Sequence, residues 1–238
     1  MLAALLGRPH RWFDRHPYAG DPRASVAWRT MRLPNSEHTS RPWRIHELTR
    51  DFRLEDVWAL PTPGGPDDLQ RLVRQFASHD PRAVNAQGRY VGRDDHGLSA
   101  RAGRMLFGLR WKLGELFGWD EPDSGIGRRV SSLRDRLPAD LRDAAPGPDL
   151  RPRVPFTSVF QTHDEWAAEI ANRTVHAVMH IGWVPDADGA YRGQMAVLVK
   201  PNGLLGRAYM AAIAPFRRLI VYPALTAGIG RDWRAVDA

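Results

Sequence analysis

The segment from Thr162 to Lys200 holds most of the side chains in this chain that could carry out chemistry. Imidazole titrates near neutral pH, so His176 and His180 are candidate catalytic acid/base groups, and Glu169 or Asp164 could orient one of them. The competing interpretation is a pair of hydrogen-bonded structural histidines, with Glu169 and Arg173 forming an ion pair. The titratable side chains of interest are His163, Glu169, Arg173, His176 and His180.

A β-strand from Thr174 to Val184 would position these histidines. Side chains alternate along a strand, so His176, Val178 and His180 share one face, and the apolar residues from Val175 to Trp183 form the other. Four residues of strand separate the two rings by roughly 13 Å, which is too far for both to bind one metal ion. The pattern therefore predicts histidines that line a cavity, and it predicts no metal site.

The rest of the chain predicts the elements around this strand. Alternation and turn residues indicate strands, and apolar residues three and four positions apart indicate helices. In chain order we expect one or two strands in Trp43–Leu60, a helix from Pro66 to about His79, helices over Ala100–Phe117 and Val130–Asp143, a strand over Phe156–Gln161, a strand or short helix over Glu165–Ala171, strands over Thr174–Val184 and Tyr191–Lys200, and a long helix from Leu204 with a kink at Pro215.

This order indicates an α+β fold, in which a curved antiparallel sheet wraps around a long C-terminal helix, with a helical insertion after the first strand. We expect residues 1–42 to be a leader or wrapping segment and 43–238 to form one domain. Its helical part would span about 66–143, and its sheet and C-terminal helix about 154–234. A gap between sheet and helix would form a ligand cavity, lined by Glu169, Arg173, Trp183, Tyr209, Met210 and Ile213 together with the two histidines.

Composition excludes several classes of site. The chain has no cysteine, which rules out disulfides, thiolate nucleophiles and cysteine metal sites. The net charge of +7 comes from arginines spread along the chain rather than from a basic patch, so we expect no specific nucleic-acid partner. The glycine-rich turns lack the strand and helix context of nucleotide sites, so we expect no cofactor. A cytoplasmic location is the default expectation for such a chain.

Several phrases of the sequence resemble a known family. NRTVH, HIGW, MAVLVKP, GLLGRAYM and PFRRLIVYP occur in this order, and residues 33 to 233 are similar to the DUF2867 family of bacterial domains of unknown function. That family is grouped with the helix-grip, START-like (SRPBCC) proteins. The resemblance implies a seven-stranded sheet that grips a C-terminal helix around a hydrophobic cavity, and it implies no assigned reaction. Helix-grip relatives bind lipids, sterols or polyketides, and some catalyse cyclisation or hydrolysis.

Three functions stay open at this point. The favoured one is binding of a small apolar or amphipathic molecule in the cavity. The second is a cyclase-like or hydrolase-like cavity enzyme, with His176 or His180 as base and Arg173 stabilising negative charge. The third is a basic scaffold or membrane-surface protein. Arginines and prolines interrupt the apolar stretch Leu204–Ile229, so we expect no transmembrane segment, and a homodimer remains an option.

Overall fold

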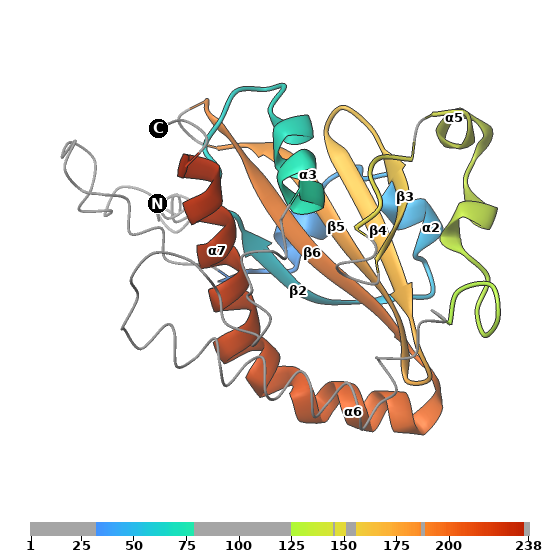
Figure 1. The fold of residues 1–238 in the computed structure, drawn as a ribbon. Coiled ribbons are helices and arrows are strands. Elements are labelled where there is room, and N and C mark those ends of the chain that lie inside the picture. Colours follow the sequence, from blue (N-terminus) through green and yellow to red (C-terminus); the bar gives the residue numbers. More distant parts are fainter. Residues whose placement is uncertain (1–31, 79–124, 145, 151–155, 187–188, 236–238) are drawn as a thin grey trace, which may run out of the picture.

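The computed structural model describes residues 32–78, 125–144, 146–150, 156–186 and 189–235. It has an α+β fold in which helices cover a curved, open sheet (Figure 1). Six strands pair antiparallel in the order β1-β2-β6-β5-β4-β3. The predicted α+β class, with an antiparallel sheet and a C-terminal helix, is confirmed. The strands are β1 Arg32–Leu33, β2 Arg53–Ala59, β3 Thr157–Gln161, β4 Glu165–Ala171, β5 Val175–Pro185 and β6 Tyr191–Pro201.

Strands β5 and β6 form the long central pair of the sheet. Their register runs from Val175 opposite Pro201 to Pro185 opposite Tyr191. Near the turn between them, Gly189 has φ +79°, in the left-handed region that glycine adopts without steric cost. The strands predicted over Thr174–Val184 and Tyr191–Lys200 are therefore confirmed to within one residue. The segment Glu165–Ala171, which fitted either a strand or a short helix, is strand β4.

One face of the sheet, which we call the helix face, is covered by α3 (Leu69–Ser78) and α7 (Tyr222–Ala235) (Figure 1). Its core joins Met179 and Trp183 of β5 to Leu72 of α3 and Trp233 of α7. The two β5 residues of this core occupy odd-numbered positions, which alternation along a strand places on one face. The predicted helix from Pro66 to about His79 is confirmed as α3.

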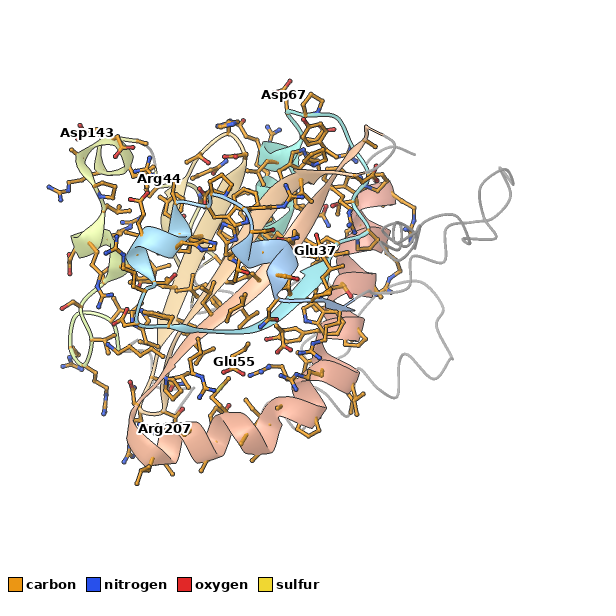
Figure 2. The ribbon with its side chains drawn as sticks, turned by 180° about the vertical axis from the view of Figure 1, so that it is seen from behind. Glu37, Arg44, Glu55, Asp67, Asp143 and Arg207 are labelled. Carbon is orange, nitrogen blue, oxygen red and sulfur yellow. The ribbon has the colours of Figure 1, made fainter. Side chains whose placement is uncertain are left out.

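The opposite face, which we call the N-terminal face, is covered by short helical segments (Figure 2). Its core joins Val178 of β5 to Val57, Ile45 and Leu133. The helical piece predicted over Val130–Asp143 is present here as two short helices. The covering segments are α1 Ser36–Thr39, α2 Ile45–Leu48, the 3-10 helix η3 Leu133–Arg136 and α5 Ala139–Arg142.

The C-terminal helix bends near its middle, as predicted. It consists of α6 (Gly203–Phe216), a π-helical turn η4 (Arg217–Val221) and α7. Pro215 cannot donate a helical hydrogen bond, and π-turns are common where a helix changes direction. The bend sends α7 across the sheet and leaves α6 at the end where β6 finishes (Figure 1). It also directs Arg217 and Arg218 toward buried Asp56 of β2, with Nε to carboxylate distances of 3.1 and 2.8 Å.

One prediction about the first third of the chain needs correction. The start of Trp43–Leu60 is helix α2 rather than strand, because Ile45 and Leu48, three positions apart, both enter the N-terminal-face core. Residues 32–42, which belong to the predicted leader or wrapping segment, pack against the sheet, since β1 pairs with β2 and His38 is only 1% exposed. The helix predicted over Ala100–Phe117 lies outside the described residues. The other domain boundaries stay predictions.

Candidate functional site with two carboxylate–imidazole pairs

Two buried glutamates on β4 lie beside two buried histidines on β5. Glu165 and Glu169 are four residues apart, as are His176 and His180, so each couple shares one face of its strand. The register puts Ala167 opposite His180 and Ala171 opposite His176. Each glutamate is therefore the diagonal neighbour of one histidine. All four residues are at most 2% exposed, so the strand pairing builds two buried carboxylate–imidazole pairs.

The first pair holds the 3-10 helix against the sheet. Nε2 of His176 lies 2.7 Å from a carboxylate oxygen of Glu169. The hydroxyl of Ser132 donates to the same carboxylate at 2.5 Å, and the backbone N–H of Leu133 donates at 3.1 Å. The carboxylate thus has protein partners on both sides. Arg173 lies exposed in the β4–β5 turn. Among the described residues, Glu169 bonds to Ser132, Leu133 and His176 and not to Arg173, its predicted ion-pair partner.

The second pair continues into a longer row. Oε2 of Glu165 lies 2.9 Å from Nε2 of His180, and Nδ1 of His180 lies 3.0 Å from Nε2 of His38 on α1. The backbone N–H groups of Arg44 and Ile45, at the start of α2, donate to the Glu165 carboxylate at 2.7 and 3.3 Å. His38 is 1% exposed, so the whole row is inside the protein. Three elements, β4, β5 and α1, each supply one member.

Burial dominates the electrostatics of this row. Loss of water raises the pKa of Glu165 from 4.5 to about 7, although the two backbone N–H groups oppose the rise. Burial, with a smaller contribution from neighbouring imidazoles, lowers the pKa of His180 to about 3 and that of His38 to about 2. Both rings are therefore neutral at neutral pH. The contact between Glu165 and His180 is a hydrogen bond rather than a salt bridge between full charges.

The sheet separates the residues that were predicted to line one cavity. The placement of both histidines in a cavity under the C-terminal helix is wrong, because the helix packs on the apolar side of β5 and the imidazoles point to the other side. Trp183 is also a packed core residue, whose indole N–H donates to the carbonyl of Gly65 at 2.8 Å. Glu169, His176 and His180 lie on the N-terminal face, and Trp183, Tyr209, Met210 and Ile213 lie on the helix face.

Glu165, Ser132 and His38 were not among the predicted site residues. The sequence does indicate Glu165, because it lies four positions before Glu169 and shares its face if the segment is a strand. The local sequence does not indicate Ser132 or His38. His38 lies 142 residues from His180, in the segment that was expected to be a leader.

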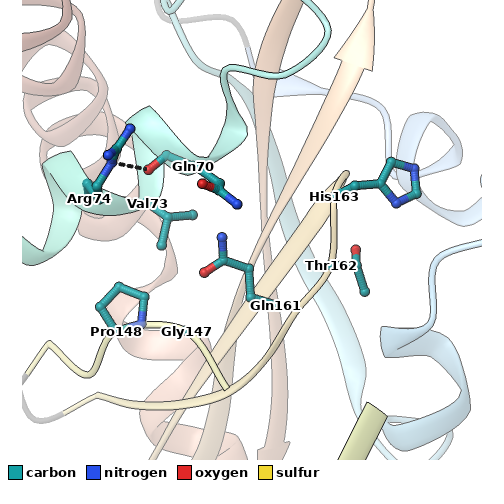
Figure 3. A pocket seen from close by; sticks show the side chains of 8 residues that line it. All are labelled: Gln70, Val73, Arg74, Gly147, Pro148, Gln161, Thr162 and His163. Atoms are coloured by element: carbon teal, nitrogen blue, oxygen red, sulfur yellow. Dashed lines mark hydrogen bonds between the residues drawn. The ribbon is translucent and has the colours of Figure 1, made fainter. Parts of the chain in front are cut away.

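A separate surface pocket of about 530 Å³ opens beside α3 (Figure 3). Neither carboxylate–imidazole pair lines it. Among the residues that the structure describes, no group of three His, Asp or Glu side chains is placed to hold a metal ion. In the same part of the chain, no helix is long and apolar enough to cross a membrane. The pocket is lined by Gln70, Val73, Arg74, Gly147, Pro148, Gln161, Thr162 and His163.

A family model described as "Protein of unknown function (DUF2867)" matches residues 48–224. The chain belongs to this family. No curated protein and no solved structure was found to match it. The DUF2867 match runs from the end of α2 into α7, so it contains both carboxylate–imidazole pairs, whereas α1 with His38 precedes it. The description of the DUF2867 family states no activity, so function has to be argued from the geometry.

Proposed function

We propose that the protein binds a small apolar or amphipathic molecule on the helix face, between the sheet and the bent C-terminal helix. The observation that supports this is a band of apolar side chains that the described residues leave half-buried. A ligand that covers such side chains is stabilised by about 25 cal/mol for each Å² of apolar surface that it removes from water. The band consists of Ile170 on β4, Ala177 on β5, Val197 on β6, Ile213 on α6 and Val221 in η4.

The neighbours of this band favour binding over chemistry. Tyr209 and Met210 pack beside it with Val175 and Val199, so its surroundings are apolar. Both carboxylate–imidazole pairs point to the other face of the sheet and offer the ligand no acid or base. Of the predicted ligand residues, Tyr209, Met210 and Ile213 fit this site. The order of the strands and the placement of the C-terminal helix on one face also support our proposal that the fold is of the helix-grip type.

The first test is native mass spectrometry of freshly purified full-length protein. We expect a small molecule that co-purifies and that dissociates on denaturation. The second test titrates the protein with the apolar dye anilinonaphthalene sulfonate. Ala177→Phe places a large side chain in the middle of the band and should weaken dye binding about tenfold or more, the loss that roughly 1.4 kcal/mol produces.

The control is Ala224→Phe, the same substitution at an exposed position of α7. It should leave the dye affinity unchanged, and circular dichroism should show both variants folded. Equal dye affinity in wild type and both variants, with no co-purifying molecule in several preparations, would overturn the proposal.

A further inference from the structure

The row Glu165–His180–His38 ends at an atom without a partner. Within the described residues, Nδ1 of His38 is buried and makes no hydrogen bond, and the same holds for Nε2 of His46. The two rings stack, with centroids 4.9 Å apart and planes 10° from parallel. A buried polar atom without a partner has given up its hydrogen bonds to water without replacement, so its presence in a folded protein calls for an explanation.

The hydrogen bonds of the row link the protonation states of its members. When Glu165 is ionised it can only accept, so His180 donates from Nε2 and accepts at Nδ1. His38 must then donate from Nε2, which leaves its Nδ1 as a bare lone pair. When Glu165 is protonated, every donor reverses: the carboxyl donates to His180, His180 donates from Nδ1, and His38 carries its proton on Nδ1. Both states keep the same hydrogen-bonded atoms.

We propose that Glu165, His180 and His38 form a proton relay, a general acid/base site that ends at Nδ1 of His38. Uptake of one proton at that atom forms an N–H bond there, and the Nε2 proton of His38 passes to Nδ1 of His180. The Nε2 proton of His180 then passes to the carboxylate of Glu165. The unit gains one proton, its charge changes from −1 to zero, and both imidazoles are neutral before and after.

The surroundings keep the two states close in free energy. The pKa of Glu165 is about 7, so both are populated near neutral pH. His46, the carboxylate of Asp164 and the guanidinium of Arg44 also act on this row. The guanidinium of Arg44 turns outward to Asp140 at 2.7 Å and to Glu47 at 3.0 Å, so its charge is compensated at the surface. This relay is independent of the apolar site, because it lies on the other face of the sheet.

The other carboxylate–imidazole pair provides an internal comparison. Glu169 has the same diagonal relation to His176, and its carboxylate accepts from Ser132 and Leu133 just as that of Glu165 accepts from Arg44 and Ile45. His176 contacts the ring of Phe52 at 5.0 Å between centroids instead of a second imidazole. The Glu169 pair is thus a closed structural contact, and it serves as a control for the open row that ends at His38.

The relay can be tested by nuclear magnetic resonance on full-length protein with ¹⁵N-labelled histidine. Long-range ¹H–¹⁵N correlations report which ring nitrogen carries the proton. We expect His180 and His38 to carry it on Nε2 near pH 8.5 and on Nδ1 near pH 5.5, with one shared midpoint. Rings that keep one tautomer over this range, or that change at separate pH values, would overturn the proposal without any variant.

Variants then identify the end of the relay. Glu165→Gln should hold both rings in one tautomer at every pH, because the amide does not titrate. Glu169→Gln, the matched change on the same strand, should alter the signals of His176 and leave the exchange at His180 and His38 as in wild type. A tautomer change that persists in folded Glu165→Gln would show that the proton does not end on Glu165. If Glu165→Gln does not fold, the pH titration of the wild type decides alone.

Discussion

Replacement of Glu165 by glutamine should change how stability depends on pH. Burial raises the pKa of this carboxyl from 4.5 to about 7, so the folded state holds the proton more tightly than the unfolded state. The stabilisation is fully present below pH 4.5 and is lost as pH rises through 7. Linkage with these two pKa values gives a loss of about 2–3 kcal/mol between pH 5 and pH 8. Glu165→Gln lacks this loss.

The assay is urea denaturation of both proteins at pH 5, 6, 7 and 8, and the measured quantity is the difference between their free energies of unfolding. His38 and His180 also contribute, because their pKa values fall below the usual 6.5 and their stabilisation is lost as pH drops below it. Both proteins retain these rings, and burial is the main cause of their low pKa values, so most of their contribution cancels in the difference. Glu47→Gln, on the exposed side of α2, controls for the loss of a carboxylate. A difference between wild type and Glu165→Gln that stays constant from pH 5 to 8 would refute the reasoning.

Two further predictions concern the C-terminal helix. Asp56→Asn should lower the free energy of unfolding by about 3–5 kcal/mol, because three guanidinium groups contact this fully buried carboxylate. Glu55→Gln, with one such contact at a more exposed carboxylate, should cost far less in the same denaturation experiment, and equal losses would contradict this account. Gly206→Ala should destabilise by about 2–3 kcal/mol or more, because a Cβ there collides with the backbone oxygen of Thr174. Gly228→Ala, where a Cβ has room, should raise the melting temperature, and a fall would count against the helix packing.

The strands of this protein were predictable because their signals are local. Alternation along β5 separates His176 and His180 from Met179 and Trp183, and the turn at Gly189 sets the pairing with β6. The same alternation also implies that these histidines and Trp183 cannot line one cavity. The error arose from the choice of which face the C-terminal helix covers, a choice that depends on packing between distant segments.

The partners of the histidines were not predictable for a related reason. Helices α1 and α2 have four residues each, too short for helical periodicity or for stability outside the fold. His38 reaches His180 only because α1 docks on the sheet, and nothing in the sequence around His38 marks that contact. Glu165 was predictable, since a strand over Glu165–Ala171 places it on the same face as Glu169.

The sheet does not require imidazoles on the N-terminal face of β5. Val178 lies between His176 and His180 on that face and is fully buried in an apolar core, so apolar side chains fit there. Two buried glutamates and three buried histidines instead occupy the face, each with a cost of desolvation that hydrogen bonds only offset. For the pair at Glu169, the contacts to Ser132 and Leu133 provide the compensation. For the row at Glu165, the backbone N–H groups of Arg44 and Ile45 compensate the carboxylate, and the row ends at Nδ1 of His38, the atom at which the proposed relay takes up its proton.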